Sequence, residues 1–232
     1  MPSSDSEPGS RRGRTHDAMG AREAILNAAE AVFAEHGFDG ARIDAIAKQA
    51  GYNKSLIFQY FDSKLGLYNE VIRRADAQVR GIQTKALEVL ADENLLSDRN
   101  TIEALLGELV GTYFDYLVAH PRVARIYNWE MAEGWQTYAK IVSQQDYDDI
   151  TVFTPILEHL QATGLMRSSS NPMVHISAAL FVCHNFLGLI PMYRLLMPTA
   201  DLTSAEALAD TREHIIEFIV HGLLADSVKA GV

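Results

Sequence analysis

Apolar side chains recur at helical spacing along most of the chain. Between residues 21 and 37 they fall three and four positions apart, at Ile25, Ala28, Ala29, Val32 and Phe33. Similar patterns predict further helices over 44–50, 54–60, 63–90, 100–120, 121–131, 146–164, 173–197 and 204–227. We find no convincing strand alternation and no internal repeat. The pattern therefore predicts an all-α fold of about nine helices.

Two of these predicted helices are short and are joined by a tight turn. Ala47 is small enough to let the helices over 44–50 and 54–60 cross closely. Gly51 suits a turn that a Cβ atom would resist, and Asn53 can cap the second helix with its side-chain oxygen. This arrangement is typical of a helix-turn-helix, whose second helix places its N-terminal side chains in the DNA major groove.

Several short motifs follow one another between Ala21 and Arg73. They are Ile25-Leu26 with Ala28-Ala29, Phe33 with Gly37-Phe38, Ile46-Ala47, Ala50-Gly51, and Tyr60-Phe61 followed by Ser63-Lys64. In this order they resemble the N-terminal domain of TetR-family transcriptional regulators. The resemblance covers about a quarter of the chain, and beyond it only the all-helical pattern agrees with the family.

The resemblance implies a three-helix DNA-binding domain followed by a helical domain for ligand binding and dimerisation. We expect a disordered arm over 1–20, a DNA-binding domain over 21–66 with its helix-turn-helix at about 42–61, and the second domain over 67–232. The arm carries three clustered arginines: Arg11, Arg12 and Arg14. They fit either a solubilising tail or an arm that reaches a DNA groove.

The resemblance also implies which side chains meet DNA. The candidates are Arg42, Asn53, Lys54, Ser55, Leu56, Phe58, Gln59, Tyr60 and Lys64. Gln59 is the best base-reading candidate, because glutamine can form two hydrogen bonds with adenine. Tyr60 and Lys64 stand where the family contacts the DNA backbone. The alternative is an ordinary helical bundle in which these polar residues form a solvated face.

Three candidate residues depart from the family pattern. Arg42 stands where the family usually has a serine or threonine cap, although its longer side chain could still reach a phosphate. Phe58 replaces a frequent tyrosine, and Leu56 replaces a frequent threonine. These departures leave the operator sequence open.

Aromatic residues gather in the middle and late helices. They suggest a ligand pocket whose candidates are Tyr127, Trp129, Met131, Trp135, Phe153, His175, Phe181, His184 and Asn185. The alternative is that each of them simply belongs to the core. Because the region lacks a basic cluster, we expect an unidentified effector that is apolar or aromatic rather than strongly acidic.

The helices over 173–197 and 204–227 have more apolar surface than one buried face requires. This excess indicates self-association, and the resemblance implies a homodimer on an approximately palindromic operator in double-stranded DNA. The candidate interface residues are Leu180, His184, Leu187, His214, Phe218 and His221. His214, Glu217 and His221 also have a spacing that could present donors to a metal, but the same face fits a dimer seam.

The charge of the chain does not exclude DNA as a partner. The formal net charge is −10, yet residues 1–64 hold eight basic and nine acidic residues, whereas 65–232 hold 12 and 21. A nearly neutral N-terminal part can still present a local basic face.

Other functions have less support in the sequence. We find no nucleophile beside a base, no phosphate loop and no paired carboxylates, so we do not expect an enzyme. We expect no metal and no cofactor, and the single cysteine, Cys183, is expected to be inert because it lies in an apolar helix. We also expect no membrane span and no secretory signal, hence a cytoplasmic protein. A ligand-responsive repressor is the leading hypothesis, with a helical small-molecule carrier or structural dimer as the alternative.

Overall fold

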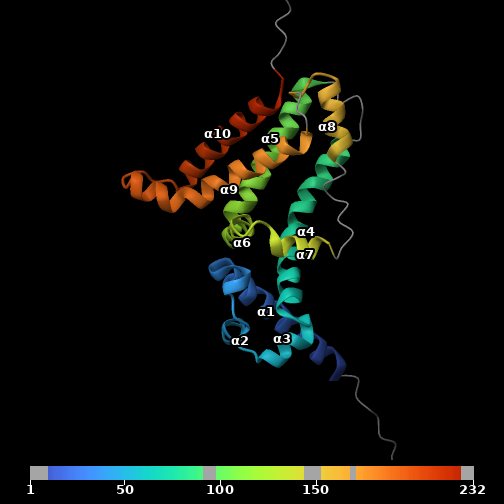
Figure 1. Cartoon of the computed structure of the whole chain (residues 1–232), viewed down its shortest axis with the longest axis vertical. Coiled ribbons are helices and arrows are strands. Elements are labelled where there is room, and N and C mark those ends of the chain that lie inside the picture. The colour runs from blue at the N-terminus through green and yellow to red at the C-terminus, as the bar shows by residue number, and fades with distance from the viewer. Residues whose placement is uncertain (1–9, 91–97, 144–152, 168–170, 226–232) are drawn as a thin grey trace, which may run out of the picture. The chain divides into compact units, whose positions relative to one another are not determined.

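The computed structural model describes residues 10–90, 98–143, 153–167 and 171–225. These residues form ten helices and no strand, which confirms the all-α prediction (Figure 1). The helices are α1 (Ser10–Gly40), α2 (Ile43–Ala50), α3 (Lys54–Phe61), α4 (Lys64–Leu90), α5 (Arg99–Ala119), α6 (Pro121–Ala132), α7 (Gln136–Val142), α8 (Phe153–Ala162), α9 (Pro172–Leu196) and α10 (Ala205–Leu223). The chain divides into two compact units between Ala75 and Asp76, within α4.

The first unit contains α1 to α3 and the beginning of α4. The apolar stripe predicted on α1 forms its core, where Ile25 and Phe33 are fully buried together with Ile46 of α2 and Ile57 of α3. Phe33 also meets Tyr68 of α4 edge to face, with 4.8 Å between ring centroids. Burial of these side chains gives α2 and α3, which have only eight residues each, the tertiary support that short helices need.

The predicted helix ends of this unit are present. Gly37 and Gly51 both have left-handed φ angles, of 67° and 76°. The Asn53 Oδ1 atom accepts a hydrogen bond from the Leu56 amide at 2.9 Å, so Asn53 caps α3 as predicted. Arg42 stands at the N-cap of α2 and makes no side-chain capping bond, also as expected.

The start of α1 differs from the predicted arm. The backbone is helical from Ser10 onwards, whereas we expected disorder over 1–20. Residues 10–20 contain no proline, and extending a helix from an ordered turn is much easier than starting one. Residues 1–9 lie outside the described part of the chain.

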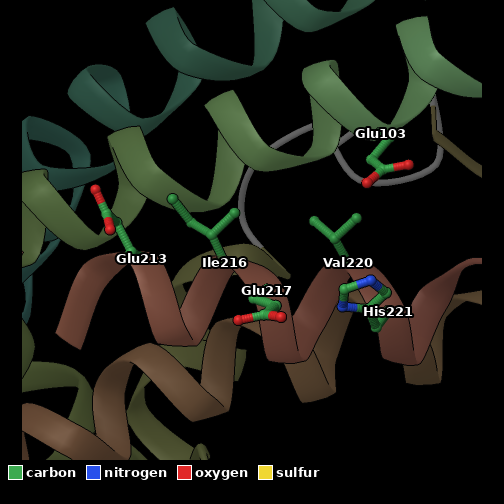
Figure 2. Close-up of a pocket in the computed structure, with 6 residues that line it drawn as sticks. All are labelled: Glu103, Glu213, Ile216, Glu217, Val220 and His221. Atoms are coloured by element: carbon green, nitrogen blue, oxygen red, sulfur yellow. The ribbon is translucent and has the colours of Figure 1, made fainter. Parts of the chain in front are cut away.

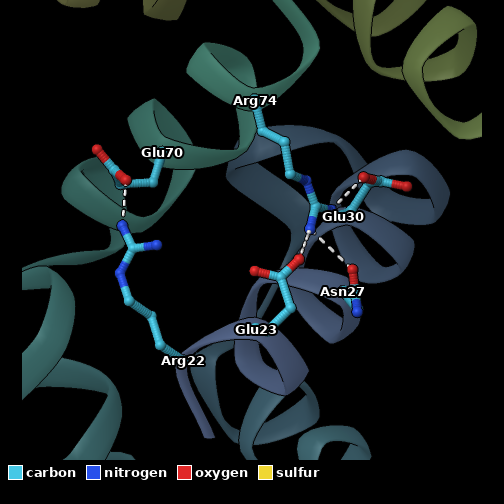
Figure 3. Close-up of polar contacts among 6 residues, drawn as sticks. All are labelled: Arg22, Glu23, Asn27, Glu30, Glu70 and Arg74. Atoms are coloured by element: carbon cyan, nitrogen blue, oxygen red, sulfur yellow. Dashed lines mark hydrogen bonds and ion pairs between the residues drawn. The ribbon is translucent and has the colours of Figure 1, made fainter. Parts of the chain in front are cut away.

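Ion pairs hold α4 against α1 in the first unit (Figure 3). The Arg74 guanidinium donates to three acceptors on α1: Glu23, Asn27 and Glu30. Arg22 of α1 donates to Glu70 of α4. Although partial burial would raise the pKa of Glu70, hydrogen bonds from Arg73 and Arg22 hold that pKa below its usual value. Glu70 therefore stays ionised and keeps its arginine partners.

In the second unit α10 packs against α5 and α9. Gly111 of α5 makes room for the Arg212 side chain, which continues past it to Asp115, with 2.9 Å between Nε and Oδ2. The α10 helix ends at Leu223 rather than at the predicted residue 227. The reason is a short antiparallel pairing with residues 165–167, in which the Arg167 amide donates to the Leu223 carbonyl at 2.9 Å.

The structure adds one helix to the prediction and changes the expectation for another. The α7 helix has only seven residues, too few to produce a clear periodic pattern. Within the described residues, one segment of α9, Ser177–Leu196, is long and apolar enough by composition to cross a membrane, whereas we expected no such segment. Cys183 and His184 in this segment are nevertheless buried within the protein.

Candidate nucleic-acid interface and ligand site

The α3 helix has one buried face and one exposed face. Ile57 and Phe61 are buried against the rest of the first unit. The opposite side exposes four of the predicted DNA-contacting residues: Lys54, Ser55, Phe58 and Gln59. Leu56 and Tyr60 are half-buried at its edges, and Asn53 is exposed at its start. An exposed helix face of this kind can enter a DNA major groove when the opposite face is packed against the protein.

The lysines predicted to contact phosphate have protein partners. The Lys54 Nζ atom lies 2.5 Å from the Asp44 Oδ1 atom of α2, and both side chains are exposed. The Lys64 Nζ atom donates to the Asp39 carbonyl at 3.2 Å and lies 4.7 Å from the centre of the Phe38 ring. These contacts position both ammonium groups at the surface of the first unit.

Two further exposed residues lie in the helix-turn-helix and were not among our candidates. Tyr52 is exposed in the turn after Gly51, and Lys48 is exposed on α2. Residues 41–64 contain four basic and two acidic residues, so this segment is positive although the whole chain is negative. The local charge count, rather than any motif, could have drawn attention to Lys48.

The second unit contains a buried cluster of aromatic and polar side chains. The His184 ring of α9 lies between two tyrosines, and its Nε2 atom shares a hydrogen bond with the Tyr113 hydroxyl at 2.6 Å. The Tyr127 ring meets His184 edge to face, and the Tyr127 hydroxyl donates to Asp76 of α4. Trp135 and Tyr138 pack on Tyr127 and on each other. We call these six residues, Asp76, Tyr113, Tyr127, Trp135, Tyr138 and His184, the aromatic cluster.

Burial sets the protonation states in this cluster. It lowers the pKa of His184 to about 4, so the imidazole is neutral near pH 7. Burial also raises the pKa of Tyr113 and of Tyr127 well above the usual value, so both keep their hydroxyl protons. The neighbouring Cys183 thiol has its pKa raised by burial to about 12, which agrees with the expectation that it is inert.

Two carboxylates are buried in or beside the cluster. Asp76 is 9% exposed and Glu130 is 1% exposed. One oxygen of Glu130 accepts a hydrogen bond from the Tyr138 amide at 3.0 Å. Asp76 was not among the predicted residues, although it follows the buried Ile72 by four positions, which places a carboxylate on an apolar helix face.

The predicted pocket residues do not all meet in one place. Tyr127, Trp135 and His184 belong to the aromatic cluster. Outside the cluster, Trp129, Phe181 and Asn185 are exposed, whereas Met131 is half-buried. His175 is half-buried, and its enclosed Nδ1 atom has no hydrogen-bond partner among the described residues. The side chain of Phe153 lies outside the described residues.

The predicted interface residues fall into two groups. Leu180, His214, Phe218 and His221 are exposed on α9 and α10. Leu187 is half-buried against the core of the second unit, and His184 is inside the unit. We therefore remove His184 from the interface candidates, because its hydrogen bond and burial place it in the aromatic cluster instead.

A surface hollow of about 260 Å³ lies between α5 and α10 (Figure 2). Its lining residues are Glu103, Glu213, Ile216, Glu217, Val220 and His221. Glu217 and His221, two of the three residues whose spacing could suit a metal ion, line this hollow. The third residue, His214, does not. In the part of the chain that the structure describes, no group of three His, Cys, Asp or Glu side chains is placed to hold a metal ion.

Comparison with known families accounts for both units. Residues 25–71 match the family described as bacterial regulatory proteins, tetR family. Residues 103–219 match the tetracyclin repressor-like C-terminal domain, over half of the chain. This chain belongs to the TetR family.

Individual relatives agree with this assignment. The chain is 33% identical to the HTH-type transcriptional repressor NicS of Pseudomonas putida over 156 residues, which cover 66% of this chain and 69% of NicS. It is 36% identical to the HTH-type transcriptional activator FasR of Mycolicibacterium smegmatis over 110 residues, about half of each protein. A TetR family transcription regulator from Marinobacter aquaeolei shares the fold, with a TM-score of 0.64 at 18% identity over 91% of this chain and 99% of that one.

This TetR-family chain is therefore a DNA-binding transcriptional regulator, and ligand-responsive DNA binding is typical of its family. The helix-turn-helix supplies the DNA-binding part, and the matched C-terminal domain contains most of the aromatic cluster.

Proposed function

We propose that this regulator is a repressor that leaves a palindromic operator when a small apolar or aromatic molecule binds the aromatic cluster. The observation that carries the DNA-binding part is the exposed face of α3, which lies opposite its buried face. This exposed face carries Lys54, Ser55, Phe58 and Gln59. We assign base reading to Gln59 and the half-buried Leu56. Arg42, Asn53, Tyr60 and Lys64 then flank the helix and contact phosphates.

The effector part of the proposal rests on the aromatic cluster. Its rings offer an apolar surface, while the neutral His184 and the two tyrosine hydroxyls offer a few directed polar groups. Asp76 joins this cluster to α4, the helix that also carries Lys64 of the DNA-binding unit. An effector that binds one conformation of the cluster better therefore shifts the position of α4, and operator affinity falls by the effector's differential affinity for the two states.

A homodimer completes the proposal. The exposed apolar residues on α9 and α10, including Leu180 and Phe218, would be covered by the same helices of a second copy. Two recognition helices then meet successive major-groove faces about 34 Å apart, which requires an approximately palindromic operator. We infer that the protein acts in the cytoplasm and catalyses no reaction.

The first test is selection of random duplex DNA by the purified protein. We expect enrichment of a palindrome, which supplies the operator for titrations at several salt concentrations. The double variant Lys54→Ala with Lys64→Ala should weaken operator binding and reduce the salt slope by about 0.9 for each phosphate that the protein no longer neutralises.

The matched control is Lys140→Ala, which removes an exposed lysine from the second unit. It should leave the affinity and the slope unchanged. If the double variant keeps the wild-type slope, these lysines do not contact phosphate. If no palindrome is enriched, a carrier without specific DNA binding becomes the better hypothesis, and loss of operator binding cannot then be the effector response.

A further inference from the structure

The exposed ion pair between Asp44 and Lys54 lies at the surface that we assign to DNA. The Asp44 carboxylate comes from the first turn of α2, and Lys54 is the first residue of α3. Their charged atoms are 2.5 Å apart. We propose that Asp44 acts as an electrostatic brake on DNA binding, because a DNA phosphate must displace its carboxylate from Lys54.

Helix electrostatics explain why the carboxylate occupies this place. The N-terminal end of a helix carries a partial positive charge that favours anions. Asp44 lies at that end of α2, where it is favoured. Lys54 lies at the corresponding end of α3, whose first turn contains no acidic residue, so its ammonium group gains from an anion supplied by another element. A DNA phosphate near these two helix ends would satisfy the same groups.

The brake has two physical components. Lys54 must exchange a carboxylate for a phosphate, so its binding to DNA is not a pure gain. The displaced Asp44 then faces the negative backbone of DNA, which adds repulsion. Because phosphates carry no sequence information, both components act equally on the operator and on any other duplex.

The strength of exposed ion pairs limits the size of the effect. Pairs of this kind change an equilibrium by a factor of about two to five, so DNA can still break the pair. Asp44 thus lowers affinity without preventing binding. The consequence for the regulator is weaker retention on the many non-specific sites of a chromosome and easier release from its operator.

The test measures Asp44→Asn on a scrambled duplex and on the selected operator across a range of salt concentrations. We expect both affinities to rise by about two- to fivefold per protomer and the salt slope to become steeper. In a Lys54→Ala background the gain should shrink, because no pair has to be broken. Asp44→Ser, which also suits the first turn of a helix, should repeat the gain.

Asp39→Asn is the control for charge alone, since it removes one exposed carboxylate from the same unit and keeps the backbone carbonyl that Lys64 uses. An equal gain from Asp39→Asn, or an undiminished gain without Lys54, would overturn the brake. So would unchanged or weaker binding by Asp44→Asn. This proposal rests on the DNA-contact surface proposed above, but the scrambled duplex tests it independently of whether a palindrome is selected.

Discussion

His184 is buried, so each of its two ring nitrogens needs a hydrogen-bond partner. Its Nε2 atom shares a hydrogen bond with the Tyr113 hydroxyl, and its enclosed Nδ1 atom has no partner within the described protein. A phenol donates more strongly than it accepts, so we assign the Tyr113 hydroxyl as donor to Nε2 and the proton of the neutral ring to Nδ1. An effector with an acceptor oxygen would therefore suit Nδ1.

Burial of His184 predicts a specific loss of stability in acid. The unfolded chain takes up a proton on this histidine as the pH falls through about 6.5, whereas the folded protein resists until about pH 4. Protonation therefore favours the unfolded state in this window. We expect His184 to account for a loss of roughly 2 kcal/mol in the free energy of unfolding between pH 7 and pH 5.

Denaturant titrations of the wild type and of His184→Gln at both pH values measure this loss. The Gln variant should lose less stability in acid, because its amide does not titrate. The control is His214→Gln: hydrogen bonding to the Asp210 carbonyl and the nearby Asp210 carboxylate raise the pKa of the exposed His214. This control should retain the wild-type loss. Equal acid sensitivity of the wild type and His184→Gln would contradict the assignment of a buried neutral ring.

The α3 and α4 helices of the first unit are joined by a tight turn. The Ser63 Oγ atom accepts a hydrogen bond from the Gly66 amide at 3.0 Å and thereby caps α4. The crowding at Gly66 was not predicted: a Cβ atom there would lie 2.1 Å from the Phe61 carbonyl oxygen. Backbone atoms cannot yield as the end of a flexible side chain can, so only glycine fits this turn.

Gly66→Ala should therefore lower the free energy of unfolding by about 2–3 kcal/mol, despite the higher helix propensity of alanine. Gly81→Ala is the matched control on the same helix, since a Cβ atom at Gly81 meets no atom of the described residues within 4 Å. It should be neutral or stabilise the protein by up to about 1 kcal/mol. Thermal and denaturant unfolding measure both variants. A neutral Gly66→Ala would mean that α3 and α4 can separate at little cost.

The sequence predicts elements better than it predicts the contacts between them. Caps such as Asn53 and Ser63 depend on residues three positions away, so their patterns are visible in the sequence. The contact of Tyr127 with Asp76 joins residues 51 positions apart, and nothing in either local pattern specifies it. The exposed face of α3, to which we assign DNA contact, was predictable because its buried residues lie together on the opposite face. The membership of the aromatic cluster was only partly predictable, because aromatic residues such as Trp129 and Phe181 suit either a buried cluster or a surface.

At the scale of the whole molecule, α9 and α10 expose more large apolar side chains than a stable isolated chain requires. The apolar side chains of Leu195, Leu196 and Phe218 are 82%, 69% and 69% exposed. Large exposed apolar surface marks an interaction site in most proteins. In the dimer that we propose, the same helices of a second copy would cover this surface, which would also account for the membrane-like composition of α9, because a helix buried on several sides needs no polar face.

The dimer hypothesis predicts that Phe218→Glu changes the assembly and leaves the fold unchanged. The side chain is exposed in a single chain, so a charge there should cost the isolated chain little stability, but two copies would bury it in the seam. Sedimentation should show a mass close to that of one chain, and operator affinity should fall because one chain engages only one half-site. Met19→Glu is the control, since Met19 is similarly exposed on α1, outside the proposed seam. If Phe218→Glu remains dimeric, the dimer interface lies elsewhere. If the variant is monomeric and still binds the full operator as tightly as the wild type, the two recognition helices do not act as a pair.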